Sequence, residues 1–154
     1  MRRFLLIVMQ QLNLPSYNFS VKDGEIFDII RKKYVRLTPE EWVRQHFVRF
    51  LIEEKGFPKS LMSTETALRL FNTVKRTDIT VFSSFGDVVA VVECKAPTVE
   101  INQTTFSQIA RYNIKLQARF LMLTNGLTHY CIKLDKDTKK YEFLKEIPKY
   151  NELI

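Results

Sequence analysis

The residues best suited to chemistry follow an apolar run in the middle of the chain. Residues 88–92 are all Val or Ala, which predicts a buried central strand, and Glu93-Cys94-Lys95 comes directly after them. Because side chains alternate along a strand, Glu93 and Lys95 point to one face and Cys94 to the other, where it packs. Alone, a Glu-x-Lys sequence is most often a solvated ion pair, so a functional interpretation needs a second group.

Asp78 is that second group. It lies in a predicted strand over residues 76–82, although aspartate is depleted in strands. If the two strands form a hairpin centred on Phe85-Gly86, counting back along both places Asp78 opposite Glu93. Two carboxylates roughly 5 Å apart repel by about 3 kcal/mol at an effective dielectric of about 20. Protonation of one carboxylate or a cation between the two would relieve that repulsion. Lys95 supplies part of the compensating charge and a divalent ion would supply the rest, and oxygen ligands suit Mg²⁺ or Mn²⁺.

The elements that must position these residues follow from apolar spacing and turn signals. Thr38 and Pro39 begin a helix with Glu41 as its capping-box acid, and Gly56 ends it. The predicted elements are a β-hairpin (17–21 and 25–30), a helix (38–55), strands (61–70, 76–82 and 88–96), a second helix (102–117) and strands (120–124, 129–134 and 141–144). This order indicates an α/β or α+β fold, a sheet packed against helices.

The length and charge of the chain narrow the function class. The 154 residues suit a single domain over 1–154, with its core at about 36–134. Residues 1–12 are expected to be a flexible or non-native extension, with Met9 as an alternative start. Lys and Arg total 24 against 17 Asp and Glu, a net charge of +7, which favours nucleic acid as the partner. Candidate DNA contacts are Arg44, Lys75, Arg76, Arg111 and Lys115.

Three further features bear on location and on the site. The two cysteines, Cys94 and Cys131, are too sparse for a disulfide scaffold, which favours reduced thiols and a cytoplasmic location. No apolar run approaches the roughly 18 residues that span a membrane, so no membrane association is expected. Gln108 and Tyr112 lie four residues apart and share a helix face; the plain alternative is the boundary of an amphipathic helix.

Three motifs together resemble the PD-(D/E)xK nuclease superfamily: Arg76-Thr77-Asp78, Glu93-Cys94-Lys95-Ala96-Pro97 and Gln108-x-x-x-Tyr112. More narrowly, residues 37–46 (LTPEEWVRQH) and Thr124-Asn125-Gly126 resemble the N-terminal nuclease domain of type I restriction enzyme R subunits. The resemblance covers roughly residues 13–148. Thr77 departs from the pattern, since it stands where the superfamily name has Pro.

The resemblance implies a restriction-endonuclease-like αβββαβ core, a mixed central sheet flanked by helices, here with an added N-terminal hairpin. It implies that Asp78 and Glu93 bind Mg²⁺ or Mn²⁺, that Lys95 assists catalysis, and that Gln108 and Tyr112 support the site or the DNA. Glu41 or Glu65 is the expected third carboxylate. The chain has no Gly-x-x-x-x-Gly-Lys-Ser/Thr loop, so no ATP site is expected in it.

The leading hypothesis is a metal-dependent DNA endonuclease domain. Its expected partners are DNA, a separate motor or specificity subunit, and a second copy of the chain in a homodimer. The first alternative is a nuclease-fold module that binds DNA or a partner protein without useful catalysis. The second is an unrelated basic α/β protein, in which Asp78, Glu93 and Lys95 form only a structural ion cluster.

Overall fold

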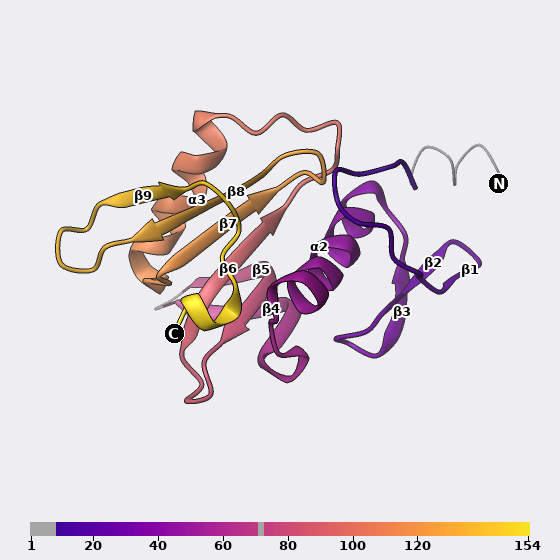
Figure 1. Cartoon of the computed structure of the whole chain (residues 1–154), viewed down its shortest axis with the longest axis horizontal. Helices are drawn as coiled ribbons and strands as arrows, with labels where there is room; N and C mark the ends of the chain where they lie inside the picture. The colour runs from indigo at the N-terminus through magenta and orange to yellow at the C-terminus, as the bar shows by residue number, and fades with distance from the viewer. Residues whose placement is uncertain (1–8, 71–72) are drawn as a thin grey trace.

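The computed structural model describes the backbone of residues 9–70 and 73–154 and the side chains of 9–67 and 76–154. Its helices and strands appear in the order expected for an αβββαβ core (Figure 1). The elements are β1 (Val21–Lys22), β2 (Glu25–Asp28), β3 (Lys33–Arg36), α2 (Pro39–Lys55), β4 (Met62–Leu70), β5 (Thr73–Phe82), β6 (Val88–Cys94), α3 (Gln103–Leu116), β7 (Phe120–Thr124), β8 (His129–Leu134) and β9 (Tyr141–Leu144), with short 3₁₀ turns at Lys59–Leu61 and Tyr150–Glu152.

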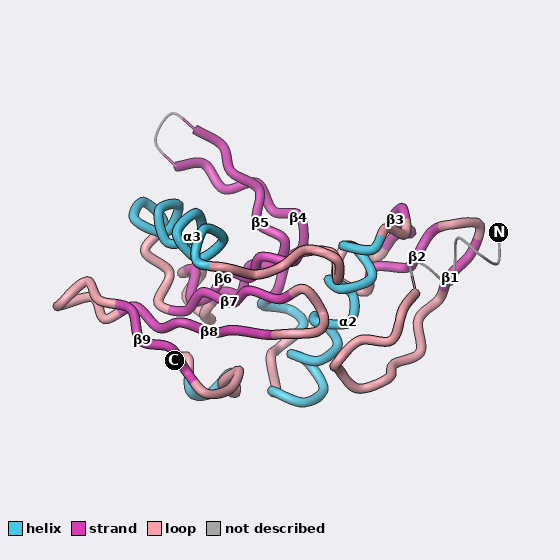
Figure 2. The backbone as a smooth tube through the Cα atoms, turned by 90° about the horizontal axis from the view of Figure 1, so that it is seen from above, coloured by secondary structure: helices cyan, strands magenta, loops and turns pink. Residues whose placement is uncertain are grey.

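Two helices flank a mixed six-stranded sheet of order β4-β5-β6-β7-β8-β9. Strands β6 and β7 run parallel and are joined by the crossover helix α3, while the other neighbours pair antiparallel. Figure 2, seen from above, shows α2 and α3 on opposite sides of this sheet. The predicted mixed sheet flanked by helices is therefore confirmed.

Helix α2 begins and ends where its sequence signals predict. The Thr38 hydroxyl accepts a hydrogen bond from the Glu41 amide at 3.0 Å, and Gly56 adopts a left-handed φ of 71° at the C-terminus. One detail differs, because the Glu41 carboxylate does not close the expected capping box. It turns instead to the side chains of Arg31, Arg44 and Gln45.

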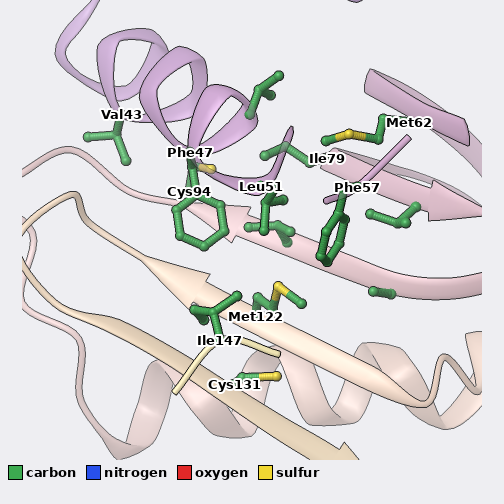
Figure 3. Packing of buried hydrophobic residues seen from close by; sticks show 14 of the residues in the cluster. Val43, Phe47, Leu51, Phe57, Met62, Ile79, Cys94, Met122, Cys131 and Ile147 are labelled. Atoms are coloured by element: carbon green, nitrogen blue, oxygen red, sulfur yellow. The ribbon is translucent and has the colours of Figure 1, made fainter. Parts of the chain in front are cut away.

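The main core lies between α2 and the sheet (Figure 3). Val43, Phe47 and Leu51 are fully buried on successive turns of α2, and they pack in one cluster with Ile79 of β5 and Met122 of β7. A smaller cluster on the other face joins α3 to the sheet. Residues beyond 36–134 also belong to the main core: Leu12, Ile26, Ile147 and Leu153.

The segment 9–14, part of which was expected to be an extension, is held against the body of the fold. Trp42 donates its indole N–H to the Gln10 carbonyl at 2.8 Å, and the Asn13 amide donates to the Gly126 carbonyl at 2.8 Å. Leu12 is buried beside Gly126. Residues 1–8 of the expected extension lie outside the described residues. In the described part of the chain, no helix combines the length and apolar character needed to cross a membrane.

The N-terminal hairpin is in fact a separate three-stranded sheet, β1-β2-β3. Strand β1 starts later than the predicted 17–21 and ends one residue beyond it, while β2 starts at residue 25 as predicted and ends at 28 instead of 30. Strand β3 was not predicted, because Lys33-Tyr34-Val35-Arg36 is mostly exposed and lacks the alternating apolar pattern of a half-buried strand. This sheet lies beside the N-terminal part of α2 (Figures 1 and 2).

Candidate active site

Asp78 and Glu93 are brought together by the antiparallel pairing of β5 and β6. Ile79 pairs with Val92, so one further step in the same register places Asp78 across from Glu93. This is the register expected from the sequence. Glu93 is the second-last residue of β6, and Asp78 lies in the middle of β5.

The register arises from two deviations that cancel. The sequence suggested that Ser84 pairs with Asp87, but the Ser83 amide donates to the Asp87 carbonyl at 2.8 Å, so the turn is shifted by one residue. A β-bulge at Val81/Phe82 then shifts the ladder back. Because a slip of one residue reverses the face of every side chain, the bulge is needed to keep Asp78 beside Glu93.

Lys95 and α3 complete one side of the site. The Lys95 Nζ lies 3.2 Å from Glu93 Oε1. Gln108 and Tyr112 of α3 line a cavity of about 130 Å³ together with Glu93 and Lys95. Burial, followed by the negative charge of Glu93, raises the pKa of the Tyr112 hydroxyl. Gln108 and Tyr112 thus face the cavity beside Glu93, as the helical spacing suggested.

Asp78 has an unusual electrostatic environment. Its side chain is 12% exposed, and Oδ2 accepts a hydrogen bond from the Cys94 amide at 2.7 Å. Burial and then the charge of Glu93 raise its pKa to about 7, against the opposing effects of the Cys94 amide and Arg44. Near neutral pH without a metal ion, this carboxyl is therefore divided between its protonated and ionised forms.

Arg44 occupies a different place from the one expected. Its guanidinium, proposed above to contact DNA phosphates, is only 6% exposed and points into the protein. It forms ion pairs with Glu41, Glu65 and Asp78. The sequence suggested no such role, because a single arginine on a helix is normally solvated.

The two candidates for a third carboxylate are placed differently. Glu41 is buried and holds Arg31 at 3.1 Å and Gln45 at 3.0 Å, with Arg44 between it and Asp78. Glu65 lies near Asp78, because Arg44 Nη1 contacts a carboxylate oxygen of each. Glu65 itself has a left-handed φ of 52° and interrupts the β4–β5 ladder at this point. Glu65, Asp78 and Glu93 form a row on the neighbouring strands β4, β5 and β6. Of the two candidates, Glu65 is the one beside Asp78 in this row.

Glu40 was missed as a member of this group. Desolvation raises the pKa of its carboxyl, while Arg44 and Lys95 oppose that rise and Glu93 adds to it. Glu40 is therefore within electrostatic reach of both Lys95 and Glu93. The signal was present in the sequence, because Glu40 stands four residues before Arg44 on the same helix face.

The remaining candidate DNA contacts lie around this site. Arg76 is 71% exposed and approaches Glu65 Oε2 at 3.6 Å, which places it beside the row of carboxylates. Arg111 and Lys115 are exposed on α3. The Lys75 side chain lies outside the described residues.

The donor atoms suit a hard divalent cation. Asp78 and Glu93 offer carboxylate oxygens, which Mg²⁺ and Mn²⁺ prefer. Within the residues that the structure describes, no three His, Cys, Asp or Glu side chains are grouped so as to enclose a metal ion by themselves. Mg²⁺ does not need such a group, because it commonly binds one or two carboxylates and completes its shell with water and phosphate oxygens.

The raised pKa of Asp78 predicts an unusual pH dependence of stability. A group with a higher pKa in the folded state binds protons more tightly there, so its stabilising effect is fully present below the unfolded pKa of about 4 and is lost as pH rises to about 7. Asp78→Asn removes this titration. Relative to the wild type in EDTA, the variant should gain roughly 3–4 kcal/mol in free energy of unfolding between pH 4 and pH 7. Urea denaturation between pH 4 and pH 7 measures the free energy of unfolding of each protein, with Asp137→Asn as the exposed control. If the difference between Asp78→Asn and the wild type did not change with pH, the raised pKa of Asp78 would be contradicted.

Comparison with known proteins identifies a family and a similar solved structure. Residues 39–148 match the model of the family described as type I restriction enzyme R protein N terminus. A solved fragment described as that of an HsdR subunit of a type I restriction enzyme from Vibrio vulnificus YJ016 superposes with a TM-score of 0.52 at 21% identity. The match covers 74% of this chain and 24% of the solved fragment, so this chain spans about a quarter of the length of that fragment. At this identity the likeness concerns the fold. No curated protein matches the chain.

Proposed function

Because the chain belongs to the family of type I restriction enzyme R protein N-terminal domains, we propose that it is a nuclease domain that hydrolyses DNA phosphodiester bonds with Mg²⁺ or Mn²⁺. In this proposal the three strands β4, β5 and β6 and the helix α3 form the catalytic part of a PD-(D/E)xK nuclease. The cytoplasm is its proposed location.

The observation that carries the proposal is the placement of Asp78 beside Glu93 in a largely buried setting. A fold that serves stability alone gains nothing from burying Asp78 beside a second carboxylate, since burial and then the charge of Glu93 raise the pKa of Asp78 to about 7. Perturbed acids of this kind are concentrated at functional sites. The +7 net charge of the chain supports an anionic substrate.

The residues have separable roles in this proposal. Asp78 and Glu93 would hold the metal ion, which supplies an activated water and stabilises negative charge on the phosphate when bound. Lys95 is held by Glu93 at 3.2 Å, where its ammonium group can stabilise charge that develops in the transition state. Gln108 and Tyr112 would orient the substrate from the α3 side of the cavity. Arg76, Arg111 and Lys115 would contact backbone phosphates without reading bases.

The family also suggests a larger assembly. The solved fragment is described as part of an HsdR subunit of a type I restriction enzyme. We therefore include a motor and a specificity subunit among the partners of this chain, together with DNA.

The experiment is incubation of the pure protein with supercoiled and linear plasmid DNA. We expect nicked or linear products in Mg²⁺ or Mn²⁺ and none in EDTA. Heat-denatured protein and the Lys95→Ala variant serve as controls for contaminating nucleases. Absence of cleavage under every divalent metal tested would contradict an autonomous nuclease.

The salt bridge from Arg44 to Asp78 specifically favours a second candidate function, a DNA-docking module without catalysis. In the absence of a metal ion, a protein cation already pairs with one proposed ligand. On this alternative the chain binds DNA, binds no Mn²⁺ in calorimetry and cuts no DNA. The two functions are thus separated by measurements on the wild-type protein.

A further inference from the structure

Arg44 is a buried cation at the centre of the acidic side of the site. Its side chain is 6% exposed, and its guanidinium contacts three carboxylates from three different elements: Glu41 on α2, Glu65 on β4 and Asp78 on β5. A buried charge is tolerated only when it is well paired, so these carboxylates and this arginine stabilise one another. The pairing draws one proposed metal ligand into a contact that a bound metal ion would oppose.

The two ends of the guanidinium have different attachments. Its Nε lies 3.0 Å from the Glu41 carboxylate one helical turn away, and its Nη1 donates a hydrogen bond to Glu65. The contact from Nη1 to Asp78 Oδ1 is the longest of the three at 3.4 Å. Arg44 can therefore release Asp78 and still remain paired with Glu41 and Glu65.

Glu41 is itself fixed, which limits where Arg44 can go. It accepts a hydrogen bond from Arg31 at 3.1 Å and one from Gln45 at 3.0 Å. Arg31 is held in turn by the fully buried Asp28 at 2.6 Å. This chain of ion pairs links Glu41, and with it Arg44, to the three-stranded sheet, so that loss of the long contact with Asp78 leaves Arg44 paired with Glu41 and Glu65.

We propose that Arg44 is a positioning residue that competes with the metal ion: in the metal-free protein it pairs with Asp78, and a divalent ion binds by displacing that contact. The inference rests on the proposed function, because it assumes that Asp78 is a metal ligand. It adds a residue that controls how tightly the ion is held. Arg44 lowers the metal affinity of the site while it stabilises the metal-free fold.

The test compares Mn²⁺ binding by the wild type, Arg44→Met and Arg49→Met in calorimetric titrations. Arg49 lies on the same helix and pairs with Glu53 at 2.9 Å, so its substitution removes the same charge from the chain without touching the site. We expect Arg44→Met to bind Mn²⁺ at least tenfold more tightly than the wild type, and Arg49→Met to stay within about twofold of it. Arg44→Met should also melt at a lower temperature in EDTA and show the larger rise in Tm with Mn²⁺.

A purely structural role for Arg44 predicts the opposite sign, because a loosened site binds metal more weakly. If the wild type binds Mn²⁺ and Arg44→Met binds it equally or more weakly, the inference is overturned and the proposed function stands. If neither protein binds Mn²⁺, both are overturned. If Arg44→Met fails to fold, the double variant Arg44→Met/Glu65→Gln removes one of the carboxylate charges that repel each other once Arg44 is gone. This double variant is expected to bind Mn²⁺ tenfold more tightly than Glu65→Gln alone.

Discussion

Replacing Glu93 with glutamine is expected to lower DNA cleavage by roughly a hundredfold or more and to weaken Mn²⁺ binding in parallel. The change keeps the shape of the side chain and removes one charge from the proposed metal site. The metal-free fold should be no less stable, because the repulsion on Asp78 is relieved. The lost ion pair with Lys95 is part-exposed on both sides and contributes little to stability. Cleavage assays and calorimetry on the purified variant measure these effects.

Two further variants make this result interpretable. Lys95→Ala should retain Mn²⁺ binding and lose rate, because Lys95 is proposed to act on the transition state and not on the ion. Glu100→Gln makes the same chemical change at an exposed loop position and should leave both cleavage and metal binding at the wild-type level. Wild-type cleavage by Glu93→Gln would remove the metal-site argument.

Replacing Asp28 with alanine is expected to lower the free energy of unfolding by about 3–5 kcal/mol. Asp28 is fully buried and accepts hydrogen bonds from the amides of Ile30 and Arg31, from the Arg31 guanidinium and from the Thr64 hydroxyl at 2.6–2.9 Å. Without the carboxylate, these donors lose their acceptor. Equilibrium urea denaturation at pH 7 measures the loss.

Asp137→Ala is the matched control for this prediction. Asp137 is exposed in the β8–β9 turn, so its substitution should change the free energy of unfolding by less than about 0.5 kcal/mol. Burial alone would raise the pKa of Asp28, but the hydrogen bonds from Arg31 and Thr64 outweigh it and hold the pKa below its usual value. The stabilisation is therefore present above about pH 4 and is lost as pH falls through the lower, folded-state pKa. Equal stabilities of wild type and Asp28→Ala at pH 7 would contradict this account.

The parts of the fold with strong local rules could be predicted from the sequence. Both ends of helix α2 were predicted correctly, because Thr38, Pro39 and Gly56 act through backbone geometry that depends little on tertiary context. The register that places Asp78 across from Glu93 matched the expectation, although the expected turn was wrong by one residue and the bulge at Val81/Phe82 cancels that shift. The bulge that makes this pairing possible was not predicted, because no residue type marks its position.

The surroundings of α2 could not be predicted from the sequence. Residues 41–48 of this helix are all buried, including Glu41, Arg44 and Gln45, because partners cover more of the helix than its apolar face. A helix pattern shows which face is apolar, whereas burial of the polar face depends on partners distant in sequence, such as Arg31 and Glu65. For this reason Arg44 was expected to meet DNA and is instead bound to carboxylates.

The main core also constrains when the protein can fold during synthesis. Leu12 and Leu153 belong to the same buried cluster, and the Tyr150 hydroxyl donates to the Phe82 carbonyl at 3.0 Å. A chain emerging from the ribosome therefore cannot complete this core until residues near 153 have left the exit tunnel. Before that point the apolar strands β6 and β7 are exposed, so a nascent chain stalled short of Leu153 should bind chaperones that recognise extended hydrophobic segments.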